Sequence, residues 1–107
     1  MKFDTNYQLL ANMYQDDYFP DFLVDKIKNL LQQVIELLET GETDMTIIQN
    51  KFDEAVESIN DLQDEFEENE SEIETVARDS IGTSVDYILH WFGIDIDVED
   101  AISARDW

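Results

Sequence analysis

Three long stretches of the chain repeat apolar residues every three or four positions, the spacing that places them on one face of a helix. The first covers residues 20–40, the second begins near Thr43, and the third ends near Phe92. Gly41 and Gly93 follow the first and third stretches, where a glycine commonly ends a helix. The pattern therefore predicts three long helices. Their predicted inward residues are Leu23, Val24, Ile27, Leu30, Leu31, Val34, Leu37 and Leu38 in the first, Ile47, Ile48, Phe52, Ala55, Val56, Ile59, Leu62 and Phe66 in the second, and Ile73, Val76, Ala77, Ile81, Val85, Ile88 and Leu89 in the third.

Shorter helices are predicted near both ends of the chain. Asp4 or Thr5 can cap a first helix of about three turns, and this helix has one apolar face. That face carries Tyr7, Leu10, Ala11 and Tyr14. Asp97 can cap a last helix that reaches about Ala104. The sequence therefore predicts an all-α fold with residues 1–107 in a single helical domain, an antiparallel helical bundle with three long helices and short terminal helices.

An acidic segment, residues 61–74, spans the end of the second long helix and the start of the third and reads DLQDEFEENESEIE. One helix running through it is the alternative, but Asn69 and Glu70 occupy positions that should then be apolar. Ser71 precedes Glu74 by three residues, which is the spacing of a capping box at a helix start. We therefore interpret residues 67–70 as a turn. Such short connections should make the three long helices antiparallel neighbours.

Charge is the property in which this chain departs most from an ordinary protein. Six Lys and Arg stand against 27 Asp and Glu, a net charge of −21, whereas a magnitude of about 2 to 8 is typical of a small domain. Hydrophobic residues still make up 43%, so a core can form and disorder is not implied. A field of this sign repels nucleic acid and anionic membranes and attracts basic proteins. Added solubility is the alternative explanation.

The first candidate site consists of the acidic turn and the helix before it. Eleven of the 22 residues in 53–74 are acids, and the nearest cations along the chain are Lys51 and Arg78. Acids four residues apart on a helix repel one another, and acids at a helix C-terminus oppose the helix dipole. Glu72 and Glu74 are instead favourable at a helix start. The uncompensated acids that we predict to bind a partner are Asp61, Asp64, Glu65, Glu67, Glu68 and Glu70.

A second candidate surface is the acidic and aromatic segment around the only proline. Its predicted partner-binding residues are Asp16, Asp17 and Tyr18, because aromatic anchors inside an acidic rim suit a basic protein. The alternative is that the aromatic rings of this segment close the end of the bundle, since burying them is strongly stabilising. These rings are Tyr14, Tyr18, Phe19 and Phe22. Trp107 is likewise expected to pack onto the core.

Catalytic and metal-binding chemistry find little support in the pattern. The chain has no Cys, and its one histidine, His90, lacks the Glu three residues earlier that di-iron bundles use. Asp86 and His90 can form a hydrogen-bonded pair on one helix face, but no nucleophile completes it. Asp95 and Asp97 begin like a calcium loop, yet Asp100 replaces the required glycine. We predict no catalytic residue, no metal ligand and no cofactor, and keep a carboxylate metal-binding or enzymatic helical bundle as an alternative.

Three blocks of the sequence resemble a small bacterial family of acidic proteins of unknown function. They are YQLLANMYQDDYFPDFLVDK at 7–26, NDLQDEFEENESEIETVARDSI at 60–81 and ARDW at 104–107. The resemblance implies a bacterial cytoplasmic protein and brings no activity, cofactor or site residue. It also implies a glycine after the asparagine of the acidic turn, where this chain has Glu70, and this departure speaks against a tight glycine turn.

The expected function is that of a non-enzymatic interaction protein whose acidic face binds a basic protein partner, in the manner of an immunity or antitoxin-like protein. A mimic of nucleic acid is one alternative, and the metal-binding or enzymatic bundle is another. Direct binding to nucleic acid or to a membrane is not expected. Residues 1–10 lack the apolar run of a signal peptide, and no segment approaches the roughly 18 apolar residues of a membrane span. We therefore expect a cytoplasmic protein, and the sequence leaves its oligomeric state open.

Overall fold

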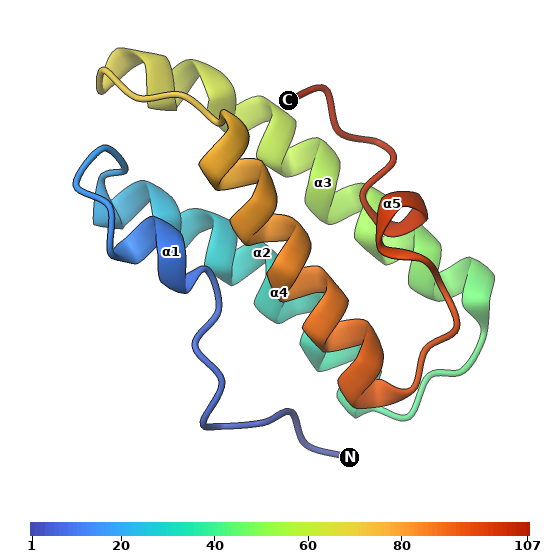
Figure 1. The fold of residues 1–107 in the computed structure, drawn as a ribbon. Helices are drawn as coiled ribbons and strands as arrows, with labels where there is room; N and C mark the ends of the chain where they lie inside the picture. Colours follow the sequence, from blue (N-terminus) through green and yellow to red (C-terminus); the bar gives the residue numbers. More distant parts are fainter.

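The computed structural model describes all 107 residues and contains five helices and no strand (Figure 1). The helices are α1 (Ala11–Tyr14), α2 (Asp21–Glu39), α3 (Met45–Glu68), α4 (Thr75–Phe92) and α5 (Val98–Ala101). Three of them are long, while α1 and α5 have 4 residues each. The predicted all-α fold, with three long helices and short helices near the ends of the chain, is confirmed.

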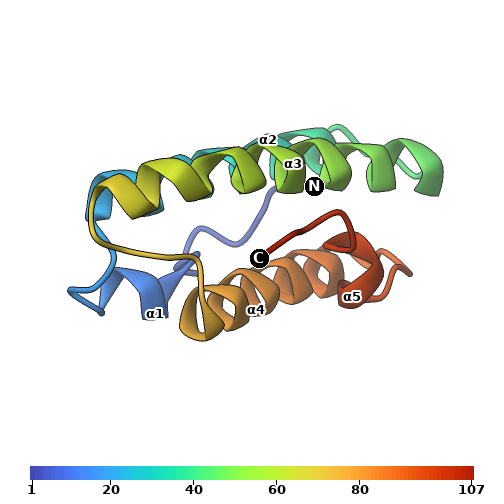
Figure 2. The same cartoon turned by 90° about the horizontal axis from the view of Figure 1, so that it is seen from above.

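The helices lie in two layers (Figure 2). One layer holds α2 and α3, which run antiparallel side by side, and the other holds α1, α4 and α5. The backbone of α4 approaches those of α1, α2 and α5 but not that of α3. The prediction of antiparallel neighbours is confirmed for α2 and α3, whereas α4 runs back in the other layer, sharing the core with α3 but without a close backbone approach to it. The reason is the connection at residues 69–74, which crosses from one layer to the other.

The core is one cluster of 26 buried hydrophobic side chains. Phe52 and Phe66 of α3 and Ile81 of α4 are fully buried within it, as their spacing predicted. Two predicted inward residues, Ile47 and Val76, are instead 44% and 40% exposed, and three others, Leu30, Leu37 and Leu62, are only partly buried. Ile47 and Val76 each belong to the first turn of their helix, where fewer neighbours surround a side chain than in the middle.

The first ten residues form no helix, so the predicted first helix of about three turns is wrong, and α1 begins only at Ala11. Asp4 shapes a turn instead, because its Oδ1 accepts a hydrogen bond from the backbone N–H two residues later at 2.9 Å. Leu10, directly before α1, has a φ of +57°. Its N–H donates to the buried Oγ of Ser84 at 3.0 Å, which ties the segment to α4.

Aromatic packing explains why this N-terminal segment, residues 2–10, is not helical. The ring of Phe3 lies 6.0 to 6.2 Å from four other rings. These are Tyr7, Tyr87, Trp91 and Phe92. Two hydrogen bonds to α4 hold the segment: Tyr87 Oη donates to Asp4 Oδ2 at 2.6 Å, and Trp91 Nε1 donates to the Lys2 carbonyl at 2.9 Å. Each aromatic pair contributes about 0.5 to 1.5 kcal/mol beyond its buried area, so together they outweigh one helix cap.

The ends of α3 and α4 have the same backbone geometry, although only one carries a glycine. After α4, Gly93 has a φ of +66°, and its N–H and the following one donate to carbonyls in the last turn. After α3, Glu70 has a φ of +60° and repeats both hydrogen bonds. This is a Schellman motif, whose left-handed position usually holds glycine. A tight turn therefore forms after α3, although its left-handed position holds Glu70 rather than glycine.

The capping box predicted at Ser71 and Glu74 is wrong. α4 begins at Thr75, and the side chain of Glu74 forms no cap hydrogen bond. Ser71 is 1% exposed, and its Oγ forms no hydrogen bond. The backbone N–H of Ser71 donates instead to the Phe66 carbonyl at 2.9 Å. Ser71 therefore completes the end of α3 rather than the start of α4.

The C-terminal part of the chain folds back over the core. Asp97 caps α5 as predicted, with its Oδ1 accepting from the Glu99 N–H at 2.9 Å, but the helix ends at Ala101 rather than near Ala104. Trp107 is buried against the core, as predicted. In none of the five helices are the length and apolar character required to cross a bilayer combined.

Candidate functional site

The two predicted partner-binding surfaces lie at the same end of the molecule. The loop between α1 and α2 and the connection between α3 and α4 are close together there in both views (Figures 1 and 2). Desolvation raises the pKa of the Tyr18 hydroxyl, and the negative charges of Glu72 and Glu74 on the α3–α4 connection raise this pKa further. We call this surface the acidic end. Its acids are Asp16, Asp17, Asp21, Asp61, Asp64, Glu65, Glu67, Glu68, Glu70, Glu72 and Glu74.

One of the predicted site residues is already neutralised within the protein. Lys26 of α2 places its Nζ 2.6 Å from Glu65 Oε2, across the contact between α2 and α3. Both side chains are partly exposed, so the ion pair contributes on the order of 0.2 to 1 kcal/mol. The expectation that all six predicted acids of the turn lack a nearby cation is therefore wrong for Glu65. Lys26 is 39 residues away in sequence, so the helical pattern alone could not reveal the pair.

The other predicted acids of the turn are exposed and form no ion pair. They are Asp61, Asp64, Glu67, Glu68 and Glu70. Glu67 and Glu68 lie in the last turn of α3, which contains no basic residue. Glu70 follows in the left-handed conformation described above. Negative charge is therefore concentrated at a helix C-terminus, where the helix dipole disfavours it.

The predicted residues of the second surface differ in their roles. Asp16 is partly buried, and its Oδ1 accepts from the Tyr18 N–H at 2.9 Å, so it shapes the loop. Asp17 is exposed and forms no side-chain hydrogen bond or ion pair. Tyr18 is 42% exposed, with its ring 5.1 Å from that of Phe19 in an edge contact. Asp17 and Tyr18 are thus available to a partner, whereas Asp16 holds the loop that presents them.

Exposed apolar side chains occur among these acids. Phe22 is 49% exposed and Val76 is 40% exposed, and both stand in first turns that begin at the acidic end. Phe19, by contrast, is 2% exposed. The alternative that the aromatic rings close the end of the bundle therefore holds for Phe19 and fails for Tyr18 and Phe22. Val76 was missed because its helical spacing assigned it to the core.

The predicted pair of Asp86 and His90 lies on the exposed surface of α4. Its closest contacts join His90 Nδ1 to the Asp86 carbonyl at 2.9 Å and to Asp86 Oδ1 at 3.4 Å. Of the hydroxyls near it in sequence, Ser84 is buried and accepts from the backbone of Leu10. No three His, Asp or Glu side chains come together in a group that could hold a metal ion.

Comparison with known proteins identifies a family but no function. Residues 3–107 match the model of a family of unknown function (DUF5713). The resemblance drawn from the three sequence blocks is thereby confirmed at the level of the family. No curated protein and no solved structure matches the chain.

Proposed function

Because the chain belongs to this family of unknown function, we propose from its own structure that it is a non-enzymatic interaction protein whose acidic end binds a basic protein partner. The observation that carries the proposal is the meeting of two surfaces. Unpaired acids at the end of α3 lie beside a loop and two helix starts that expose Tyr18, Phe22 and Val76. A basic surface with apolar patches would complement both features.

The acids and the apolar side chains would contribute differently to such a complex. Charges at the rim of an interface chiefly raise the association rate, and the effect weakens as salt is added. Aromatic side chains near the centre contribute most of the affinity once a partner buries them. Tyr18 and Phe22 are the aromatic candidates, and Asp64, Glu67 and Glu68 are the charged ones. Within this proposal the protein is bacterial and cytoplasmic, and an immunity or antitoxin-like role is its most concrete form.

Two charge-reversal variants with equal net charge test where binding occurs. One changes Asp64, Glu67 and Glu68 to Lys at the acidic end. The control changes Glu36, Glu54 and Glu57 to Lys, which are exposed acids without ion pairs elsewhere on α2 and α3. Each set adds 3 × 2 charges, so the net charge becomes −21 + 6 = −15 in both. Tagged wild type and variants are used to capture partners from lysate at about 0.05 M and about 0.5 M salt.

We expect a partner that is captured by wild type and by the control but not by the acidic-end variant. High salt should reduce its capture, and a variant with Tyr18→Ser and Phe22→Ser should reduce it at both salt concentrations. Equal loss in both charge variants would mean that net charge alone governs capture. Equal retention in both would mean that the acidic end is not the binding surface. Either result refutes the proposal.

A further inference from the structure

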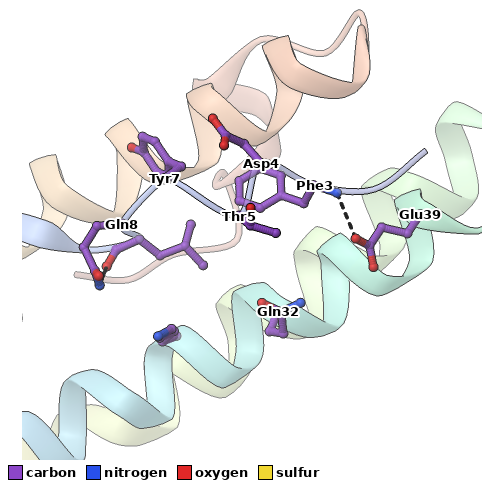
Figure 3. Close-up of a pocket in the computed structure, with 9 residues that line it drawn as sticks. Phe3, Asp4, Thr5, Tyr7, Gln8, Gln32 and Glu39 are labelled. Carbon is purple, nitrogen blue, oxygen red and sulfur yellow. Dashed lines mark hydrogen bonds between the residues drawn. The ribbon is translucent and has the colours of Figure 1, made fainter.

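A polar cleft lies between the N-terminal segment and α2, and none of its lining residues belongs to the acidic end (Figure 3). Its volume is about 220 Å³. One wall is formed by the segment from Phe3 to Leu9, and the other by Lys28, Gln32 and Glu39 of α2. In Figure 3 the Gln32 side chain lies on α2 opposite the segment that carries Thr5, and Glu39 lies nearer to Phe3. The cleft is therefore closed on one side by the non-helical segment that the sequence did not predict.

Each carboxylate around the cleft already has a partner within the protein. Asp4 accepts from the Tyr87 hydroxyl at 2.6 Å and from a backbone N–H at 2.9 Å. These hydrogen bonds, that of Tyr87 foremost, lower the pKa of the Asp4 carboxyl. Glu39 Oε2 accepts from the Phe3 N–H at 2.9 Å. Asp25, one helical turn before Lys28, accepts from the Tyr14 hydroxyl at 2.5 Å.

The positive group of the cleft has no such partner. Lys28 is partly buried and forms no ion pair and no hydrogen bond. Gln32 follows it by one helical turn, and its side-chain amide is also without a hydrogen bond in the structure. Neither carboxylate of the cleft, that of Asp4 or that of Glu39, forms an ion pair with this ammonium group. The cleft thus presents a cation and an amide to whatever enters it.

We propose that this cleft binds a small organic monocarboxylate, with the carboxylate against Lys28 and a hydrogen-bonding group of the ligand against Gln32. Charge-assisted hydrogen bonds between ammonium and carboxylate are about twice as strong as neutral ones. The volume lies below the range of about 300 to 1,000 Å³ that drug-sized ligands occupy, which suits a small metabolite. This proposal is independent of the acidic end and of the proposed partner.

The charge of the protein selects among anions. The field of a chain with net charge −21 opposes each added negative charge on a ligand. One ammonium can offset a single carboxylate, but a phosphate near neutral pH carries about −1.5 to −2. The carboxylates of Asp4 and Glu39 in the same cleft add to the repulsion of a dianion. A monocarboxylate is therefore favoured over phosphate.

Three probes separate these chemistries in the intact protein: lactate, the uncharged lactamide, and inorganic phosphate. Binding is followed through the backbone amide resonances by NMR at constant ionic strength. We expect lactate to shift the amides of residues 3–9 and 28–32 with saturation in the millimolar range, a binding free energy of about −4 kcal/mol at 1 mM. Lactamide and phosphate should each bind at least about 10-fold more weakly.

Matched lysine variants test the assigned cation. Lys28→Gln should weaken lactate binding about 10-fold or more. Lys51→Gln should leave it unchanged, because Lys51 is also partly buried and without an ion pair but lies on α3 and does not line the cleft. Gln32→Leu, which keeps the charge, should weaken lactate binding by a smaller factor than Lys28→Gln. Lys28 and Gln32 are only partly buried on α2, so substitution there should not unfold the protein. The dispersion of the amide spectrum reports whether each variant folds.

Several results would overturn the proposal. Shifts that do not saturate by about 20 mM lactate would mean that the cleft holds no site of useful affinity. Equal binding of lactate and lactamide, or tighter binding of phosphate than of lactate, would refute the assigned ligand class. Unchanged lactate binding in Lys28→Gln, or equal weakening in Lys28→Gln and Lys51→Gln, would refute the role of Lys28.

Discussion

Replacing Glu70 with glycine should stabilise the protein. Glu70 holds a φ of +60°, a conformation that costs a residue with a Cβ about 1 to 2 kcal/mol and that glycine adopts freely. The greater freedom of glycine in the unfolded chain offsets about 0.5 to 1 kcal/mol of this gain. The change also removes a carboxylate just beyond the C-terminus of α3, where the helix dipole disfavours negative charge by about 0.3 to 1 kcal/mol. The expected net gain in unfolding free energy is about 1 kcal/mol.

Two further variants separate the backbone from the charge. Glu70→Ala removes the carboxylate but keeps the Cβ, so it should gain only the dipole contribution. Gly93→Ala introduces a Cβ at a φ of +66° and should destabilise by about 1 kcal/mol. Urea unfolding followed by circular dichroism measures each change, and 1 kcal/mol corresponds to about 4 to 8 °C in Tm for a domain near this size. If Glu70→Gly and Glu70→Ala are equally stable, the left-handed backbone at Glu70 is not a source of strain and the reasoning fails.

Three other predictions concern the segment connections and the charge. Ser71→Ala should leave the unfolding free energy unchanged or raise it by up to about 1 kcal/mol, because a buried hydroxyl without a hydrogen bond is removed. A loss of about 1 kcal/mol in urea unfolding would instead indicate that Ser71 caps α4. Tyr87→Phe should destabilise the protein at neutral pH. Its hydrogen bond lowers the pKa of Asp4, so the difference from wild type should be constant well above about pH 4 and shrink as the pH falls further; a difference that grows on acidification would contradict this. Added salt should raise Tm, because it screens the mutual repulsion of the acids over a Debye length of about 10 Å at 0.1 M; a Tm that falls between 0.01 M and 0.1 M would show that attractive pairs dominate.

The long helices could be predicted from the sequence because their signal is local and repeated. α2 carries an apolar residue every three or four positions over 19 residues. Gly93 directly follows the last residue of α4, and Asp97 directly precedes the first residue of α5. The first helix failed for the opposite reason. Asp4 has the local form of a cap, but its partner is Tyr87, 83 residues away. A long-range aromatic and hydrogen-bonded contact thus overrode a local preference, and a single sequence offers no pattern that reports such a contact.

The candidate site could likewise be predicted only in those parts that depend on residues near one another in the sequence. The acids at the end of α3 lie close together in the sequence. Local composition and the rule that the helix dipole disfavours acids at a C-terminus were therefore enough to find them. Their neutralisation at Glu65 depends on Lys26 of another helix, and their nearness to Tyr18 depends on how two layers pack. The cleft beside Lys28 gives no signal at all, because it exists only where the N-terminal segment lies over α2. Local charge could be predicted, whereas the pairing of charges required the fold.

The one ion pair at the acidic end sharpens what its remaining acids imply. Lys26 removes the repulsion that Glu65 would exert on Asp61, yet Asp64 still faces Glu68 four residues on, and Glu67 and Glu68 still oppose the dipole of α3. Lys26 therefore lies within reach of α3 but neutralises only Glu65 among the acids at its end. The remaining acids reduce the stability of the free protein, and a cationic partner bound there would remove that destabilisation. Charge reversal at Asp64, Glu67 and Glu68 should accordingly raise the stability of the free protein and abolish its binding to the partner. If these acids had a purely structural role, their reversal would instead lower the stability of the free protein.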